Sequence, residues 1–126
     1  MKRLMTKRFS KWAADQGVSI GDLANALEEV EQGTFEASLG GKIIKKRIRF
    51  AGQGKSKSGR TIICFQKDKM AVFIHGFAKN EKSNLSSKEL DALKEFAKIL
   101  FAYSAADIQK SIETGVLIEV KLCGNQ

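Results

Sequence analysis

The residues of this chain that could do chemistry are concentrated in one basic segment, residues 37–67. This segment contains nine lysines and arginines and no aspartate or glutamate. The whole chain has 22 basic and 14 acidic residues, so the remainder carries 13 basic and 14 acidic residues. Solvated surfaces ordinarily mix both signs, because like charges packed together repel each other. The segment therefore predicts an anion-binding site, with RNA or DNA as the expected ligand. Its basic residues are Lys42, Lys45, Lys46, Arg47, Arg49, Lys55, Lys57, Arg60 and Lys67.

Part of this segment alternates as a β-strand does. Residues 46–50 read Lys-Arg-Ile-Arg-Phe, which places Ile48 and Phe50 on one side of a strand and Arg47 and Arg49 on the other. This alternation argues against a membrane-surface role, since such a role favours a basic amphipathic helix.

Other kinds of site have less support. His75 is the only histidine and lies far from both cysteines in the sequence, so we expect no metal site. His75 is either a general base or a structural histidine. Glu81 lies between Lys79 and Lys82, where it could form a surface ion pair, act as a base or orient a lysine. A phosphate loop at residues 54–56 is not expected, because no glycine stands at position 49 and a strand pattern follows.

The elements that must position these residues can be predicted from periodicity and from helix-capping residues. A short first helix contains Phe9 and Trp12 and ends near Gly17. Capping pairs then predict the starts of three more helices. Expected strands cover residues 43–50, 61–65, 70–76 and 116–122, and residues 52–59 are expected to form a flexible basic loop. The capping pairs are Ser19 with Asp22, Ser86 with Glu89, and Ser104 with Asp107.

This order predicts a small α+β domain: N-terminal helices, an antiparallel sheet, then C-terminal helices and a possible final strand. At 126 residues and 43% hydrophobic content, one domain can bury a core. We expect no signal peptide, because no apolar run of about seven residues follows the basic start. No stretch approaches about 18 apolar residues, so we expect no membrane span. We also expect the protein to be cytoplasmic. Its two cysteines, Cys64 and Cys123, are expected to be buried free thiols.

The order of motifs resembles a known family. A Lys-Lys-Arg-Ile-Arg strand at 45–49 leads to a Gly/Lys stretch at 52–59, then to Gly59-Arg60-Thr-Ile-Ile. An apolar strand follows and runs into Gly76-Phe-Ala-Lys-Asn-Glu81, before a helix that opens at Leu85-Ser86. This arrangement resembles the RelE/ParE superfamily of bacterial toxins, and is most similar to its HigB-like branch. The resemblance is strongest over residues 40–100, and residues from about 104 to 126 are predicted to be a C-terminal extension of a single RelE-like domain.

The resemblance implies a ribosome-dependent mRNA endonuclease that uses neither metal nor cofactor. It also implies a cognate antitoxin, expected to be of the helix-turn-helix type, and the ribosome and mRNA as partners. Arg60 matches the family's strand arginine, which would hold the phosphate. The chain departs from some members at Asn80 and Ser86, where an arginine and a catalytic residue stand in those proteins. The resemblance implies catalytic roles for Arg60, Lys79, Arg49, Lys57 and Glu81, and RNA-binding roles for Lys46, Arg47, Lys55 and Lys82.

Two other functions stay open from the sequence. Members of the same superfamily act on DNA gyrase without cutting RNA, so a toxin that binds a protein target is one alternative. A simple nucleic-acid-binding module is the other. It has little support from aromatic residues, because only Phe50 and Phe65 lie in the basic segment and both are expected to face inward.

Overall fold

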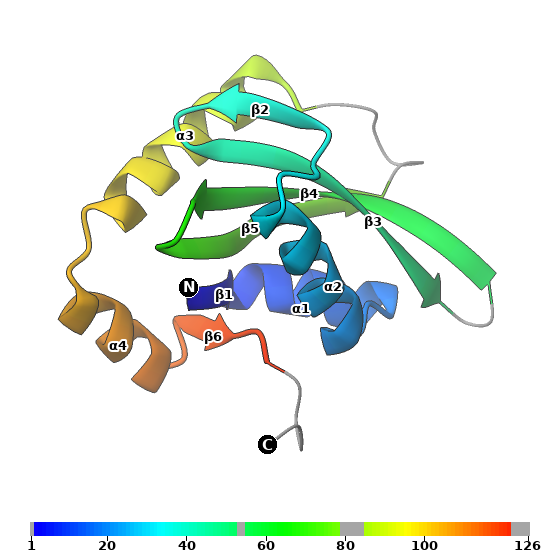
Figure 1. The fold of residues 1–126 in the computed structure, drawn as a ribbon, viewed down its shortest axis with the longest axis horizontal. Helices are drawn as coiled ribbons and strands as arrows, with labels where there is room; N and C mark the ends of the chain where they lie inside the picture. Colours follow the sequence, from blue (N-terminus) through cyan, green and yellow to red (C-terminus); the bar gives the residue numbers. More distant parts are fainter. Residues whose placement is uncertain (1, 53–54, 79–84, 122–126) are drawn as a thin grey trace.

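A computed structural model of the chain describes residues 2–52, 55–78 and 85–121. Its centre is a six-stranded mixed sheet with the strand order β2-β3-β4-β5-β1-β6, drawn in Figure 1. The strands are β1 (Lys2–Thr6), β2 (Ala37–Gly40), β3 (Ile43–Gly52), β4 (Lys55–Gln66), β5 (Met70–Ala78) and β6 (Leu117–Glu119). The helices are α1 (Lys7–Gln16), α2 (Ile20–Glu31), α3 (Ser87–Phe101) and α4 (Ala105–Glu113). The predicted α+β class is therefore confirmed.

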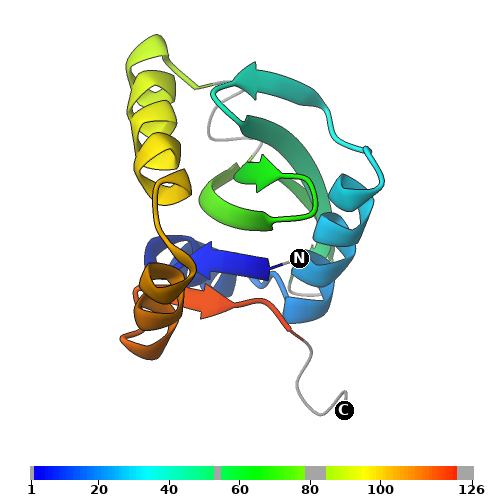
Figure 2. The same ribbon diagram turned by 60° about the vertical axis from the view of Figure 1, so that its left-hand side comes forward.

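The sheet lies between two layers of helices. Residues of α1 and α2 pack against Ile44, Ile48, Phe50 and Phe73 in one core cluster. Residues of α3 and α4 pack against Ile43, Ile62, Cys64 and Val72 in a second core cluster, on the opposite face. Figure 2 shows α2 and α3 on opposite sides of the sheet. We call the side covered by α1 and α2 the tryptophan face, since Trp12 packs there, and the side of α3 and α4 the arginine face.

Local signals predicted the helix starts correctly. Ser19 with Asp22, Ser86 with Glu89, and Ser104 with Asp107 all form capping boxes with reciprocal hydrogen bonds. The first helix ends at Gly17, whose φ of 81° is the left-handed conformation that glycine adopts readily. None of the helices in the described ranges is long and apolar enough to cross a membrane.

Three strand predictions need correction. β1 and β2 were not predicted, and residues 55–59 form part of β4 rather than a loop. β1 pairs in parallel with β5. Its central residues Leu4 and Met5 are buried in opposite core clusters. Both faces of β1 are therefore apolar, and its sequence shows no alternation of polar and apolar residues. Residues 55–59 pair with β3 through their backbone, which a Gly/Ser/Lys composition does not reveal.

The last strand pairs within the chain. A possible final strand was expected over residues 116–122. β6 is antiparallel to β1, with Met5 opposite Ile118, and Leu117 is buried in the core beneath α4. Cys64 is buried as expected, and burial raises the pKa of its thiol to about 12. Cys123 lies outside the described residues.

Candidate functional site

Two arginines oppose each other across neighbouring strands on the arginine face. In the antiparallel register of β3 and β4, Arg47 lies opposite Arg60, and Arg49 lies opposite Ser58. Across the next pair of strands, Arg60 lies opposite Phe77 of β5. Directly opposed residues share one face of a sheet, and like charges in such pairs destabilise it. We call Arg47, Arg49 and Arg60 the arginine row.

The guanidinium of Arg60 lacks part of its expected hydrogen bonding. Its Nη1 atom is buried and has no hydrogen-bond partner in the structure. Buried polar groups are nearly always satisfied in proteins, so an orphaned charged nitrogen calls for an explanation. The indole Nε1 of Trp12 is the second such atom in the described part of the chain, but that group is neutral and its ring is fixed by packing. An anionic ligand would supply the acceptor that Arg60 lacks, once the side chain turns toward it.

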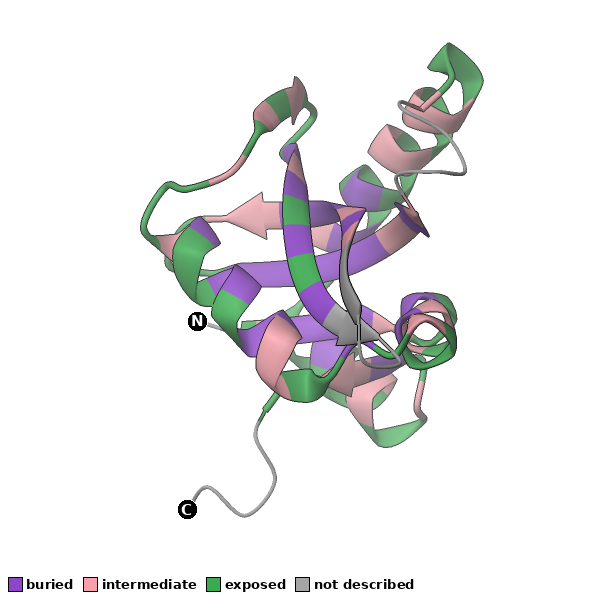
Figure 3. Ribbon diagram, turned by 90° about the vertical axis from the view of Figure 1, so that its right-hand side faces the viewer, coloured by how far each residue is buried: buried purple, intermediate pink, exposed green. Residues whose placement is uncertain are grey.

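Alternation along β3 separates Lys46 from the arginine row. Lys46 is 4% exposed, and its ammonium group lies 2.7 Å from the carboxylate of Glu29 on α2. Arg47 and Arg49 are exposed, and Figure 3 shows this alternation of buried and exposed residues along β3. The expected inward position of Ile48 and Phe50 is confirmed. The structure thus gives Lys46 a place in the packing of α2 on β3, away from the arginine row.

Contacts on both sides of β3 fix its backbone near the row. The hydroxyl of Thr61 donates a 2.8 Å hydrogen bond to the carbonyl of Lys46, and the amide of Arg47 donates to a carboxylate oxygen of Glu36.

A hollow of about 370 Å³ opens along the edge of β3, because β2 no longer covers β3 beyond Ala37. Its lining combines Asp22, Glu29 and Glu36 with the cations of residues 46, 47 and 49.

His75 and Phe77 lie on the same face as the row. His75 was expected to be either a general base or a structural histidine, and neither residue was expected beside the arginines. His75 lies opposite Ile62, and a β-bulge follows, because Ile63 is paired with Phe73. The bulge lets Ile74 and His75 both face the side of α3. The rings of His75 and Phe77 are 5.9 Å apart. His75 is half-buried and is a diagonal cross-strand neighbour of Arg60, about 7–8 Å away in such a ladder.

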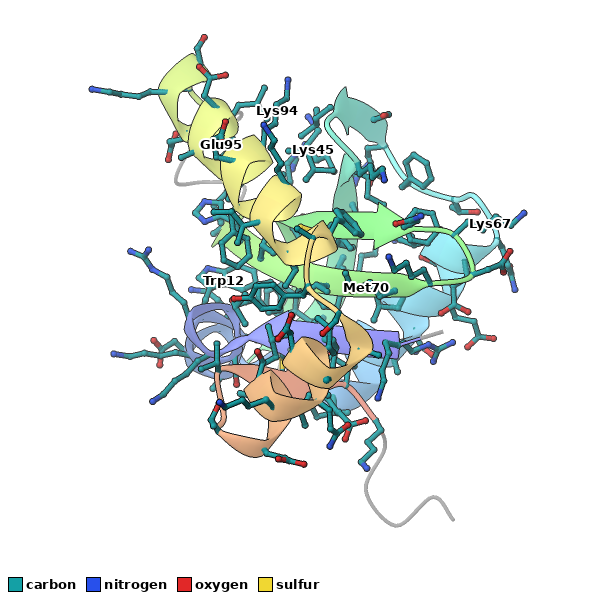
Figure 4. The ribbon with its side chains drawn as sticks, turned by 90° about the vertical axis from the view of Figure 1, so that its left-hand side faces the viewer. Trp12, Lys45, Lys67, Met70, Lys94 and Glu95 are labelled. Atoms are coloured by element: carbon teal, nitrogen blue, oxygen red, sulfur yellow. The ribbon has the colours of Figure 1, made fainter. Side chains whose placement is uncertain are left out.

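On the tryptophan face, the ring of Trp12 packs against two glycines, Gly59 and Gly76. We call these two positions the glycine notch. A Cβ atom at Gly76 would lie 2.5 Å from the ring of Trp12, and one at Gly59 would lie 3.2 Å from it. The indole therefore packs directly on the backbone of β4 and β5, next to Arg60 and His75. Figure 4 labels Trp12, and Phe9 holds its ring at a centroid distance of 5.4 Å. This packing makes the two strands that carry the candidate residues a rigid support.

Several expected site residues cannot be placed in this geometry. Lys79, Glu81 and Lys82 lie outside the described residues. Lys55 and Lys57 belong to β4, where they pair with Gly52 and Phe50, but their side chains are outside the description. Of the predicted catalytic residues, the structure brings Arg49 and Arg60 to one face. In the described ranges, no group of three or more His, Cys, Asp or Glu side chains could hold a metal ion.

Comparison with known proteins identifies the family. A search among curated proteins gave no match. The chain does match the family described as the RelE toxin of the RelE / RelB toxin-antitoxin system, over residues 1–120. This match covers nearly the whole chain, including α4 and β6, and agrees with the α+β fold. The chain therefore belongs to the RelE toxin family and is the toxin of a toxin–antitoxin system, with a cognate antitoxin as its partner.

Proposed function

We propose that this toxin is a ribosome-dependent, metal-independent endoribonuclease that cuts mRNA and so inhibits translation. The observation that carries the proposal is the arginine row. Arg47 and Arg60 stand opposite each other, and the Nη1 atom of Arg60 is buried without a partner. Such an arrangement costs stability in the absence of a ligand, and a phosphate between the guanidinium groups would relieve both the repulsion and the missing hydrogen bond.

The proposed reaction needs cations around one phosphate. The 2′-oxygen of the RNA forms a new bond to phosphorus, the bond from phosphorus to the 5′-oxygen breaks, and a 2′,3′-cyclic phosphate and a 5′-hydroxyl result. Negative charge builds on the phosphate oxygens during this displacement, and fixed donors stabilise it. Arg60 can donate two parallel hydrogen bonds through its planar fork. Arg49 supplies a second charge from the next position along the same face.

The reaction also moves protons. One proton leaves the 2′-hydroxyl and one reaches the departing 5′-oxygen, so the net proton count is unchanged. His75 is suited to one of these transfers, because imidazole exchanges protons near neutral pH and its strand position is diagonal to Arg60. Lys57, Lys79 and Glu81 stay candidates for the other transfer and for charge stabilisation. Arg47, Lys55 and Lys82 are the proposed contacts to neighbouring phosphates.

The proposal is tested by expressing the toxin without its antitoxin and mapping mRNA 5′ ends. We expect growth to stop and new 5′-hydroxyl ends to accumulate within translated reading frames. A matched culture expressing Arg60→Ala should keep its transcripts intact. Growth arrest with intact transcripts and reduced gyrase activity would instead assign the toxin to a protein target.

The proton-transfer role of His75 has its own readout. Replacement by Gln should lower the cleavage rate about 10²-fold or more and remove the limb of the pH profile that depends on the imidazole. Phe77→Leu is a suitable control, because it disturbs the same face without removing a titrating group. A His75→Gln enzyme with the wild-type pH profile would exclude the role.

A further inference from the structure

We propose a second RNA contact at the hollow where the β2–β3 turn meets α3, formed by the ammonium groups of Lys42, Lys94 and Lys98. This hollow has a volume of about 520 Å³ and is also lined by Phe101. It is separate from the arginine row, which lies farther along β3. The inference rests on the proposed function for the identity of the anion, and its test uses an RNA that cannot be cleaved.

The turn that presents Lys42 is a two-residue connection between β2 and β3, because Gly40 is paired with Ile43. Its central residues, Gly41 and Lys42, have φ values of 61° and 63°. Positive φ at both central residues is favoured in such hairpin turns because it matches the twist of the strands. Gly40 and Gly41 lie against the side chain of Lys94 on α3, so the hairpin geometry places Lys42 beside that helix.

Packing anchors two of the three lysine side chains before any ligand arrives. The ammonium group of Lys42 lies 5.2 Å from the ring centroid of Phe101, in a cation–π contact. The aliphatic part of Lys94 lies on the turn, where a Cβ atom at Gly41 would be 3.2 Å from its Cγ. Figure 4 labels Lys94 and Lys45 over the space between α3 and the β2–β3 hairpin. Anchored side chains lose less conformational entropy on binding than free surface lysines do.

The lining of this hollow carries more positive than negative charge. Glu95 is the one carboxylate in its lining, and no salt bridge joins Lys42, Lys94 or Lys98 to a carboxylate of the described residues. By contrast, Lys46 and Arg3 are each held by a glutamate. Three lysines beside a single carboxylate leave a net positive potential that attracts a polyanion.

The position of the hollow fits a strand of RNA that also occupies the arginine row. Lys42 and Arg47 are separated by five positions of an extended chain, or about 17 Å at 3.3–3.4 Å per residue. Lys45 lies between them on β3. At about 3.4 Å per nucleotide of a stacked strand, this distance corresponds to about five nucleotides. The lysines would therefore bind RNA a few nucleotides from the cleaved bond.

The test measures binding of a short 2′-O-methyl RNA, which lacks the attacking hydroxyl. The variant combines Lys42→Asn, Lys94→Gln and Lys98→Gln, since asparagine tolerates the left-handed conformation and glutamine keeps most of the lysine chain. The control combines Lys7→Gln, Lys11→Gln and Lys69→Gln, three exposed lysines elsewhere, and removes the same charge. We expect the slope of log affinity against log salt to flatten by about two units in the variant, at about 0.7 per lost contact, and by far less in the control.

Equal flattening in the variant and the control would overturn the proposal, because it would show only a general effect of net charge. Weakened antitoxin binding with unchanged RNA binding would also overturn it and assign the hollow to a protein. Lys98→Gln alone, at an exposed helix position, gives a second test if the triple variant unfolds, with an expected flattening of about 0.7 units. Because the RNA is uncleavable, the expected flattening would stand even if the toxin cut no mRNA.

Discussion

The two faces of the sheet use cations from the same basic run in opposite ways. On the tryptophan face, Lys46 is 4% exposed and its charge is compensated by Glu29 at 2.7 Å. On the arginine face, Arg47 is exposed and stands opposite Arg60, another cation. The first arrangement neutralises a buried charge where α2 packs on the sheet, whereas the second opposes folding and favours an anionic ligand. The role of each basic residue in β3 therefore depends on which face of the sheet its side chain occupies. Its place in a run of basic residues does not determine that role.

The largest effect is expected on the arginine face. Arg60→Lys should lower mRNA cleavage by about 10²–10³-fold, because an ammonium group keeps the charge but loses the planar fork. The free energy of unfolding should change little, because lysine keeps the like charge opposite Arg47. Cleavage in a translation extract and urea denaturation measure the two quantities. A folded variant with near wild-type cleavage would move the catalytic role from Arg60 to Lys57 or Lys79.

On the tryptophan face, the two partners of the ion pair should respond unequally. Glu29→Gln leaves the buried ammonium of Lys46 without its counter-charge. Because the side chain of Glu29 is 57% exposed, the loss in unfolding free energy should lie between those of exposed and buried pairs, at about 1–2 kcal/mol. Lys46→Met removes the buried charge and fills a similar volume, so its cost should be below about 1 kcal/mol. Urea denaturation of both variants checks this asymmetry. Equal losses would mean that Lys46 is not the buried partner that the structure describes.

The glycine notch gives a graded test of the same face. Gly76→Ala would place its Cβ 2.5 Å from the ring of Trp12, so we expect a loss of about 1–3 kcal/mol in unfolding free energy. Gly59→Ala is the matched control, because its Cβ would lie 3.2 Å from the same ring, and its cost should be smaller. A larger loss at Gly59 than at Gly76 would contradict the packing described for Trp12.

The parts of the fold that the sequence revealed are those set by local chemistry. Each capping box is a pair of residues three positions apart, and all three were correctly predicted. The strand parity of Ile48 and Phe50 against Arg47 and Arg49 was likewise visible within five residues. The domain boundary near residue 104 and the HigB-like branch stay predictions.

The missed features depend on partners far away in the sequence. β1 is defined by pairing with β5, more than 60 residues later, and its two buried residues face different clusters. The side chain of His75 faces the arginine face because of a β-bulge. No local sequence pattern predicted this bulge. Lys46 was grouped with Arg47 although its parity matches Ile48, and stricter use of the alternation would have separated them.

The smallest effect is expected on RNA binding, where neighbouring residues of β3 that face opposite sides of the sheet can be compared. Arg47→Gln and Arg49→Gln should each weaken binding of uncleavable single-stranded RNA a few-fold and flatten its salt dependence by about 0.7 units. Lys46→Met removes the same charge from an adjacent position but should leave that slope unchanged, because its ammonium group faces Glu29 on the other side of the sheet. All three variants carry one positive charge fewer, so net charge cannot explain a difference among them. Equal slopes for all three variants would show that RNA affinity depends on the total charge of residues 46–49. The proposal that only the arginine face binds RNA would then be wrong.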